Sequence, residues 1–211
     1  MRSEVTLVVL AKQPVAGFSK TRLSPPFSFE EAAELARAML DDTLKAVAAT
    51  PGVRPLLALK GEPGPWVPDG FEVIAQRGAS HAQRIDAAFE DAGGPALLIG
   101  MDTPQVTPEL LARSVEALQS KGVDSVLGPA RDGGWWAAGF CRPVSGAFVQ
   151  VPMSRSDTFR HQVRRFEQLG LQWAQLPTLS DVDDIDSARA VAAAAPESSF
   201  AALLAAGMLC P

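Results

Sequence analysis

The sequence predicts an α/β protein with a mainly parallel central sheet built from strand-helix-strand units. Apolar runs of strand length alternate with amphipathic segments of helical period along the chain, which is typical of βαβ units. With 211 residues, 47% of them hydrophobic, the chain can bury a sizeable core and fits one domain better than two. Since no linker or repeat interrupts it, we expect a single domain over residues 1–211.

Seven segments are expected to form strands, because apolar residues fill consecutive positions between turn residues. They are residues 5–10, 54–59, 71–75, 96–100, 125–128, 135–140 and 172–176.

The first helix has the clearest signals. Ser28 and Glu31 have the spacing of a capping box, and apolar residues then recur at helical spacing to form one buried stripe. These residues are Ala32, Leu35, Ala36, Met39, Leu40, Leu44 and Val47.

Later helices also carry start and stop signals. The second follows Ser80 and stops at Gly93, a residue that tolerates the left-handed C-cap. The third starts with Thr107 as N-cap and Pro108 in its first turn, and ends near Gly122.

A fourth helix is expected over residues 157–169. Its apolar side consists of Phe159, Val163 and Phe166. Its opposite side consists of Arg160, Arg164 and Arg165, which we interpret as a solvated face.

Charge and cysteine content narrow the classes of function. A net charge of −5 and a pI near 5.1 argue against nucleic acid or an anionic membrane as the main partner. Cys141 and Cys210 have no partner at metal-ligand spacing, so we expect plain thiols in a reducing compartment. The first apolar segment is too short for a secretory core, and nothing reaches membrane-spanning length. We therefore expect a cytoplasmic protein.

The expected strand at residues 96–100 is followed by Asp102 and Pro104. Ligands of open α/β sheets bind outside the carboxyl ends of the strands, so a carboxylate there indicates an active-site edge. Asp-Thr-Pro is also good turn chemistry, and the residues alone leave both interpretations open.

The loop after the first strand, which begins at Ala11, contains three cations: Lys12, Lys20 and Arg22. With Gly17 allowing close backbone approach, it is typical of a diphosphate cradle. It is not a P-loop, because no glycine directly precedes Lys20. A solvated basic loop is the alternative.

Asp132, Gly133 and Gly134 precede two tryptophans. Asp-Gly-Gly between strands is a strong hairpin signal. Adjacent tryptophans on a strand point to opposite faces, so Trp135 or Trp136 could wall a ligand pocket and stack on a sugar or a base.

An acidic run follows the last expected strand. We interpret Asp184 and Asp186 as helix-capping residues, and Asp181 and Asp183 as metal or acceptor ligands. Gln76 and Arg84 follow the third strand and could touch a nucleotide, although Arg84 could equally lie on a helix surface.

Four ordered motifs together carry a resemblance. They are Ala11-Lys12-x-Pro14-x-x-Gly17-x-x-Lys20-Thr21-Arg22-Leu23, Ile99-Gly100-x-Asp102-x-Pro104, Gly128-Pro129-Ala130-x-Asp132-Gly133-Gly134 and Asp181-Val182-Asp183. From Val5 to about Ala192, the chain resembles the bacterial glycosyltransferase-A-like family of nucleotide-diphospho-sugar transferase fold. It also looks related to molybdenum cofactor guanylyltransferase and phospholactate guanylyltransferase.

The resemblance implies a three-layer α/β/α sandwich, with a nucleotide-binding half at about residues 1–105 and an acceptor half at about 106–211. Lys12, Lys20 and Arg22 would lie at the phosphates, and Asp102 at a divalent cation. The nucleotide would also contact Ala11, Gly17, Gln76, Arg84, Gly133, Gly134 and Trp135.

The chain departs from the family pattern at three places. Trp135 replaces the tyrosine of Gly-Gly-Tyr, His81-Ala82 replaces a leucine-glycine pair, and Met153-Ser154 replaces a Trp-Ser step. These positions surround the base and acceptor pockets, so the pattern does not predict the substrate.

We expect transfer of a glycosyl group from a nucleotide-diphosphate sugar to a small-molecule acceptor, with Mg²⁺ or Mn²⁺ bound through Asp102 and Asp181. Lys20 and Arg22 would neutralise the leaving diphosphate. Asp132 is the first candidate for the base and Asp183 the second. The alternatives are nucleotidyl transfer from a nucleoside triphosphate and a non-catalytic nucleotide-sugar binding module.

Overall fold

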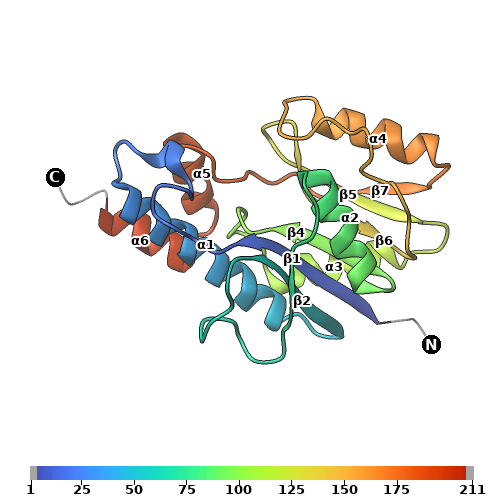
Figure 1. The fold of residues 1–211 in the computed structure, drawn as a ribbon, viewed down its shortest axis with the longest axis horizontal. Helices are drawn as coiled ribbons and strands as arrows, with labels where there is room; N and C mark the ends of the chain where they lie inside the picture. The colour runs from blue at the N-terminus through green and yellow to red at the C-terminus, as the bar shows by residue number, and fades with distance from the viewer. Residues whose placement is uncertain (1–3, 208–211) are drawn as a thin grey trace.

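The computed structural model describes residues 4–207 and is organised around one seven-stranded sheet of order β3-β2-β1-β4-β6-β5-β7 (Figure 1). Strand β6 runs antiparallel to its neighbours β4 and β5, and the other pairs are parallel. The strands are β1 (Val5–Lys12), β2 (Val53–Lys60), β3 (Glu72–Ala75), β4 (Ala96–Gly100), β5 (Ser125–Pro129), β6 (Trp135–Phe140) and β7 (Trp173–Gln175).

All seven predicted strands are present, and two of them, β4 and β6, have the predicted bounds. Strands β1 and β2 extend further than expected because their pairing continues to Lys12 and Lys60. The strands at the two edges, β3 and β7, are shorter than expected, since each pairs with one neighbour and over few residues.

Helices cover both faces of the sheet. On one face, α1 (Phe29–Ala48) and α3 (Pro108–Leu118) pack on the side of β1 that carries Leu7. On the other, α2 (His81–Ala92) and α4 (Thr158–Gln168) pack on the side that carries Val8. Burial on both faces explains why the parallel strands read as continuous apolar runs. The predicted α/β/α sandwich is confirmed.

The first part of α1 extends beyond the sheet and builds a small helical lobe, at the left of Figure 1. It packs there with η1 (Thr21–Leu23), α5 (Ile185–Ala194) and α6 (Ser199–Gly207). The Asp42 carboxylate accepts hydrogen bonds from the Ser199 and Phe200 amides, which ties α6 to α1. The lobe therefore holds the segment before α5 against the carboxyl ends of the strands.

The predicted helix signals are confirmed at the N-termini. Ser28 forms a capping box with Glu31, and Ser80 forms one with Gln83. Thr107 caps α3. As predicted, Gly93 adopts the left-handed C-cap with φ 69°, and Asp184 caps α5 through the Ser187 amide.

Two helix details differ from expectation. Helix α3 ends at Leu118, because a turn with hydrogen-bonded Ser120 and Val123 amides follows instead of a further helical turn. The solvated face of α4 includes Arg160 and Arg164, but Arg165 is half-buried and donates to the Gly146 carbonyl, so it holds a neighbouring loop.

Cys141 is a free, half-buried cysteine, and Cys210 lies outside the described residues. Over residues 4–207, the helices are too short or too polar to span a membrane.

Gly133 sets how closely two loops approach each other. Its backbone has φ +90°, and a Cβ atom there would overlap the carbonyl oxygen of Ser156. The Phe159 amide donates to the Gly133 carbonyl at 2.8 Å, which joins the start of α4 to the β5–β6 turn. Only glycine combines this φ with this contact.

Substituting Gly133 with alanine should destabilise the protein more than substituting Gly52, whose φ is +71° but whose Cβ would meet nothing within 4 Å. We expect Gly52→Ala to cost about 1 kcal/mol from backbone strain alone. Gly133→Ala adds the overlap and should cost about 3 kcal/mol. Thermal unfolding of both variants measures the difference, and equal melting temperatures would show that the loop contact is not rigid.

Candidate active site

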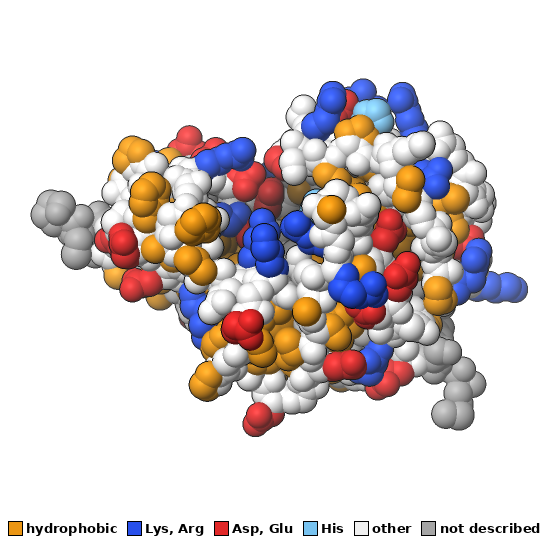
Figure 2. Space-filling model, viewed as in Figure 1, with side chains coloured by type: hydrophobic (Ala, Val, Ile, Leu, Met, Phe, Trp, Pro, Cys, Tyr) orange, Lys and Arg blue, Asp and Glu red, His pale blue; other side chains and the backbone are white. Residues whose placement is uncertain are grey.

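A cavity of about 680 Å³ opens at the carboxyl ends of the parallel strands, between the sheet and the small helical lobe. Figure 2 shows the hollow, with basic and acidic side chains gathered around it. Its volume suits a ligand of nucleotide size. Segments far apart in the sequence line it, among them those around Lys12 to Arg22, Asp102, Asp132, Arg155 and Asp183.

The cavity brings most of the predicted site residues together. Those in its lining are Ala11, Lys12, Lys20, Arg22, Gln76, Asp102, Asp132, Gly134, Trp135, Asp181 and Asp183.

Three predicted residues lie outside the lining. Gly17 has φ +75° in the turn that carries the basic loop, and Gly133 backs onto Ser156. Arg84 donates to the Gly78 and Ala79 carbonyls and so shapes the start of α2. Contact of these three with a nucleotide stays a prediction.

Lys20 joins three of the lining segments. Its ammonium donates to the Val182 carbonyl and forms ion pairs with Asp102 Oδ2 at 3.0 Å and Asp183 Oδ1 at 3.5 Å. The side chain is only 11% exposed. The Val182 amide also donates to the Asp102 carbonyl at 2.9 Å, so the loop after β4 and the segment before α5 are tied together twice.

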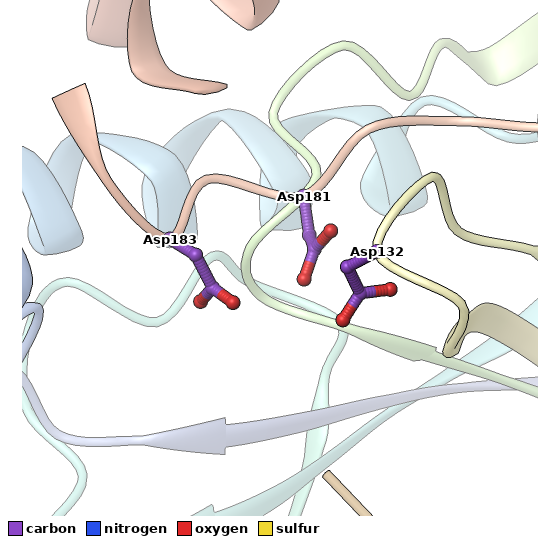
Figure 3. A group of neighbouring side chains, drawn as sticks. All are labelled: Asp132, Asp181 and Asp183. Atoms are coloured by element: carbon purple, nitrogen blue, oxygen red, sulfur yellow. The ribbon is translucent and has the colours of Figure 1, made fainter. Parts of the chain in front are cut away.

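Three carboxylates form an acidic cluster: Asp132, Asp181 and Asp183. One oxygen of each lies within 4.8 Å of the others, and Figure 3 shows the side chains extending from two neighbouring loops into the same space. Oxygen donors at this spacing suit Mg²⁺ or Mn²⁺. The two predicted metal ligands therefore have different surroundings. Asp181 belongs to the acidic cluster, whereas Asp102 forms an ion pair with Lys20.

Placing three carboxylates together has an electrostatic cost. Burial, with repulsion from Asp132 and Asp183, raises the pKa of Asp181 to about 6. Arg22 pairs with Asp183 at 3.6 Å, but its side chain is 77% exposed and it offsets little of this repulsion. A bound cation would relieve it.

The Asp-Gly-Gly segment is both a tight turn and part of the cavity wall. Asp132 Oδ1 accepts the Gly134 amide at 2.7 Å, and the Ala130 amide donates to the Gly134 carbonyl, closing the turn between β5 and β6. As predicted, the tryptophans point to opposite faces. Trp136 is buried and donates to the Pro177 carbonyl, and Trp135 is half-buried against Phe148.

The sequence interpretation did not place the loop of residues 153–156 among the site residues, although this loop is a wall of the cavity. The Thr158 hydroxyl fixes the loop by donating to the Pro152 carbonyl and accepting the Arg155 amide. The departure from the family pattern at Met153-Ser154 was the available signal, but only the fold places this loop against the turn that carries Asp132. His81 and the 86% exposed Phe18 also line the cavity.

Comparison with known families decides the relationship. Residues 36–155 match a family described as an uncharacterized protein conserved in bacteria, DUF2064. The chain belongs to this family. None of the curated proteins compared with the sequence matches it.

Solved structures confirm the nucleotide-diphospho-sugar transferase fold. One, from Desulfovibrio desulfuricans G20, is a protein for which nucleotide-diphospho-sugar transferase activity has been suggested. It has a TM-score of 0.87 and 25% sequence identity, over 98% of this chain and 96% of that chain.

Two more distant structures share the fold. The 2-C-methyl-D-erythritol 4-phosphate cytidylyltransferase of Thermus thermophilus has a TM-score of 0.56 at 16% identity, over 98% of this chain and 100% of its own. Rv0371c of Mycobacterium tuberculosis, solved with manganese, has a TM-score of 0.53 at 20% identity, over 90% of this chain and 98% of its own. The relation to the two guanylyltransferases stays an expectation from the sequence.

Asp181→Asn should stabilise the protein at pH 7.5. Because the folded-state pKa of about 6 lies above the ordinary 3.8, the cost of the charged carboxylate is fully present above pH 6, declines as the pH falls from 6 to 3.8, and disappears below 3.8. For a partly exposed group we expect about 1 kcal/mol, or about 2–4 °C in melting temperature.

At pH 5 the difference between this variant and the wild type should be smaller, because Asp181 is then protonated in the folded protein but still mostly charged in the unfolded chain, and below pH 3.8 it should vanish. Asp186→Asn, at a 90% exposed position of the same acidic run, is the control and should change little at either pH. Equal melting temperatures of wild type and Asp181→Asn at pH 7.5 would contradict the crowding of the cluster.

Proposed function

We propose that this DUF2064 protein transfers a glycosyl group from a nucleotide-diphosphate sugar to a small-molecule acceptor, with the help of a divalent cation. The observation that carries the proposal is the cavity in which the basic loop after β1 faces carboxylates from three other segments. The suggested activity of the Desulfovibrio protein supports it.

The residues present fit Mg²⁺ or Mn²⁺. Lys20 and Arg22 form ion pairs with Asp102 and Asp183, whereas Asp132 and Asp181 have no ion-pair partner among the described residues. Asp132, Asp181 and Asp183 would hold the cation, which supplies charge neutralisation at the developing diphosphate. The manganese bound by Rv0371c is in line with this assignment.

The basic loop would bind the diphosphate. Lys12 and Arg22 are exposed in the lining and offer a point charge and a bidentate fork. Lys20 lies deeper, beside Asp102, where it would reach the oxygens nearest the breaking bond.

Asp132 is the proposed base for the acceptor hydroxyl. The Gly134 amide holds one carboxylate oxygen at 2.7 Å, which fixes the orientation of the group, and the residue is exposed to the cavity. Asp183 is the second candidate, but it is already paired with Lys20 and Arg22.

Nucleotidyl transfer is the second candidate function, because a cytidylyltransferase shares the fold and the loop offers three cations for a triphosphate. Here an acceptor phosphate attacks the α-phosphate and pyrophosphate leaves, so positioning and charge neutralisation suffice and no base is needed.

Thermal shift with nucleotide sugars and nucleoside triphosphates tests both functions. A ligand at about one hundred times its Kd should add about 2.7 kcal/mol of stability, and part of the shift should require Mn²⁺. Asp181→Asn combined with Asp183→Asn should remove the Mn²⁺-dependent part, and Asp186→Asn should keep it. If neither ligand class raises the melting temperature of the wild type, both candidate functions are wrong.

Asp132→Asn separates base chemistry from metal binding when turnover and Mn²⁺ affinity are measured on the same preparation. If Asp132 acts as the base and Asp181 and Asp183 suffice to hold the cation, release of nucleoside diphosphate from the sugar donor should fall about 10²–10⁴-fold, with the Mn²⁺ Kd changing far less. A large rise in the Mn²⁺ Kd would instead assign Asp132 to the cation. Near-normal turnover, together with pyrophosphate release from a triphosphate, would favour nucleotidyl transfer.

A further inference from the structure

The ammonium of Lys20 fills a position lined by oxygen atoms. The Val182 carbonyl accepts its hydrogen bond, and carboxylate oxygens of Asp102 and Asp183 lie 3.0 and 3.5 Å from Nζ. Three oxygen partners match the three N–H bonds of an ammonium group. Lys20 can therefore donate to a diphosphate only after giving up at least one of them.

The same three oxygens are donors that a divalent cation prefers. Two carboxylate oxygens and one carbonyl oxygen form a hard oxygen set of the kind that binds Mg²⁺ or Mn²⁺. Asp183 belongs both to this set and to the acidic cluster, so the two positions adjoin. The side chain of Lys20 is largely buried, so its ammonium occupies a position suited to a cation and is not free in solvent.

The backbone of Lys20 also departs from the usual conformation. It is left-handed, with φ 48° and ψ 39°, and the Lys20 carbonyl accepts the Leu23 amide at the start of η1. A residue with a side chain rarely adopts this conformation unless its surroundings hold it there. The contacts of the ammonium with Asp102, Val182 and Asp183 stabilise Lys20 in this conformation.

We infer that Lys20 is an exchangeable cation, an inference that rests on the proposed function of the cavity. In the ligand-free protein its ammonium occupies the position among Asp102, Asp183 and the Val182 carbonyl. When a divalent cation takes this position, the ammonium leaves it and becomes available to the diphosphate of the ligand. Lys20 then neutralises carboxylates before ligand binding and phosphate oxygens after it.

Acylation of lysines followed by mass spectrometry tests the exchange on the wild-type chain. Lys20 should be protected without metal and should be labelled at least five-fold faster with saturating Mn²⁺, because its ammonium is displaced into the cavity. Lys12, which is exposed at the end of β1, is the internal control and should not change. If Mn²⁺ binds and Lys20 labelling does not change, Lys20 is a fixed clamp and the inference is wrong.

Mn²⁺ titration of Lys20→Met gives a second readout, since the variant vacates the position. It should bind as many Mn²⁺ ions as the wild type at saturation, with the Kd for the ion at this position at least ten-fold lower, because no ammonium competes for it. Arg22→Met removes an equal charge from the solvent side of Asp183 and should leave that Kd nearly unchanged. Equal Kd values in the two variants would overturn the inference.

The two proposals fail in distinguishable ways. Unchanged Lys20 labelling in a chain that binds Mn²⁺ and turns over a nucleotide overturns the exchange alone. Faster labelling in a chain that binds no nucleotide supports the exchange and overturns the proposed function.

Discussion

Four carboxylates share one cavity with the covered ammonium of Lys20, and the arrangement of the surrounding loops depends on that balance. Without Lys20, Asp102 and Asp183 would face each other with no cation between them. With it, the loop after β1, the loop after β4 and the segment before α5 converge on one nitrogen atom. Burial, with repulsion from Asp132 and Asp183, raises the pKa of Asp181, and among the described residues Asp132 and Asp181 have no ion-pair partner. The acidic cluster therefore favours a cation from outside.

Two features of the fold, the sheet edge and the small helical lobe, bring these charged side chains together. Parallel strands bring Lys12 and Asp102 to one edge of the sheet, because β1 and β4 are adjacent and run in the same direction. The reversed strand β6 brings Asp132 to the same edge, because its hairpin with β5 closes there. The small helical lobe then places Asp181 and Asp183, since Val182 between them is buried in the lobe's apolar cluster.

The sequence could predict what depends on local pattern. Strand Ala96–Gly100 and the capping boxes of α1 and α2 follow from residues a few positions apart, and the structure has them. The convergence of the basic loop with Asp102 and Asp132 was also predictable, because residues after parallel strands meet at one sheet edge.

The other contacts of the site join residues that are far apart in the sequence, and no local pattern predicts them. Nothing near Lys20 in the sequence indicates that its partner is the Val182 carbonyl, 162 residues away. Likewise, the strand-end position and the family resemblance indicate Asp102 for the metal, whereas membership of the acidic cluster depends on how the lobe places the segment before α5. The loop of residues 153–156 joins the cavity through Gly133, whose missing Cβ makes room for Ser156.

That contact between Gly133 and Ser156 also bears on the acceptor. The turn that carries Asp132 packs directly against the loop that carries Arg155, so Asp132 and this loop cannot shift independently. Arg155 is already paired with Asp157, and Thr158 clamps the loop backbone. An acceptor must therefore fit a wall that is largely formed before it arrives, which favours selection by shape and by the polar groups of Ser154 and Arg155.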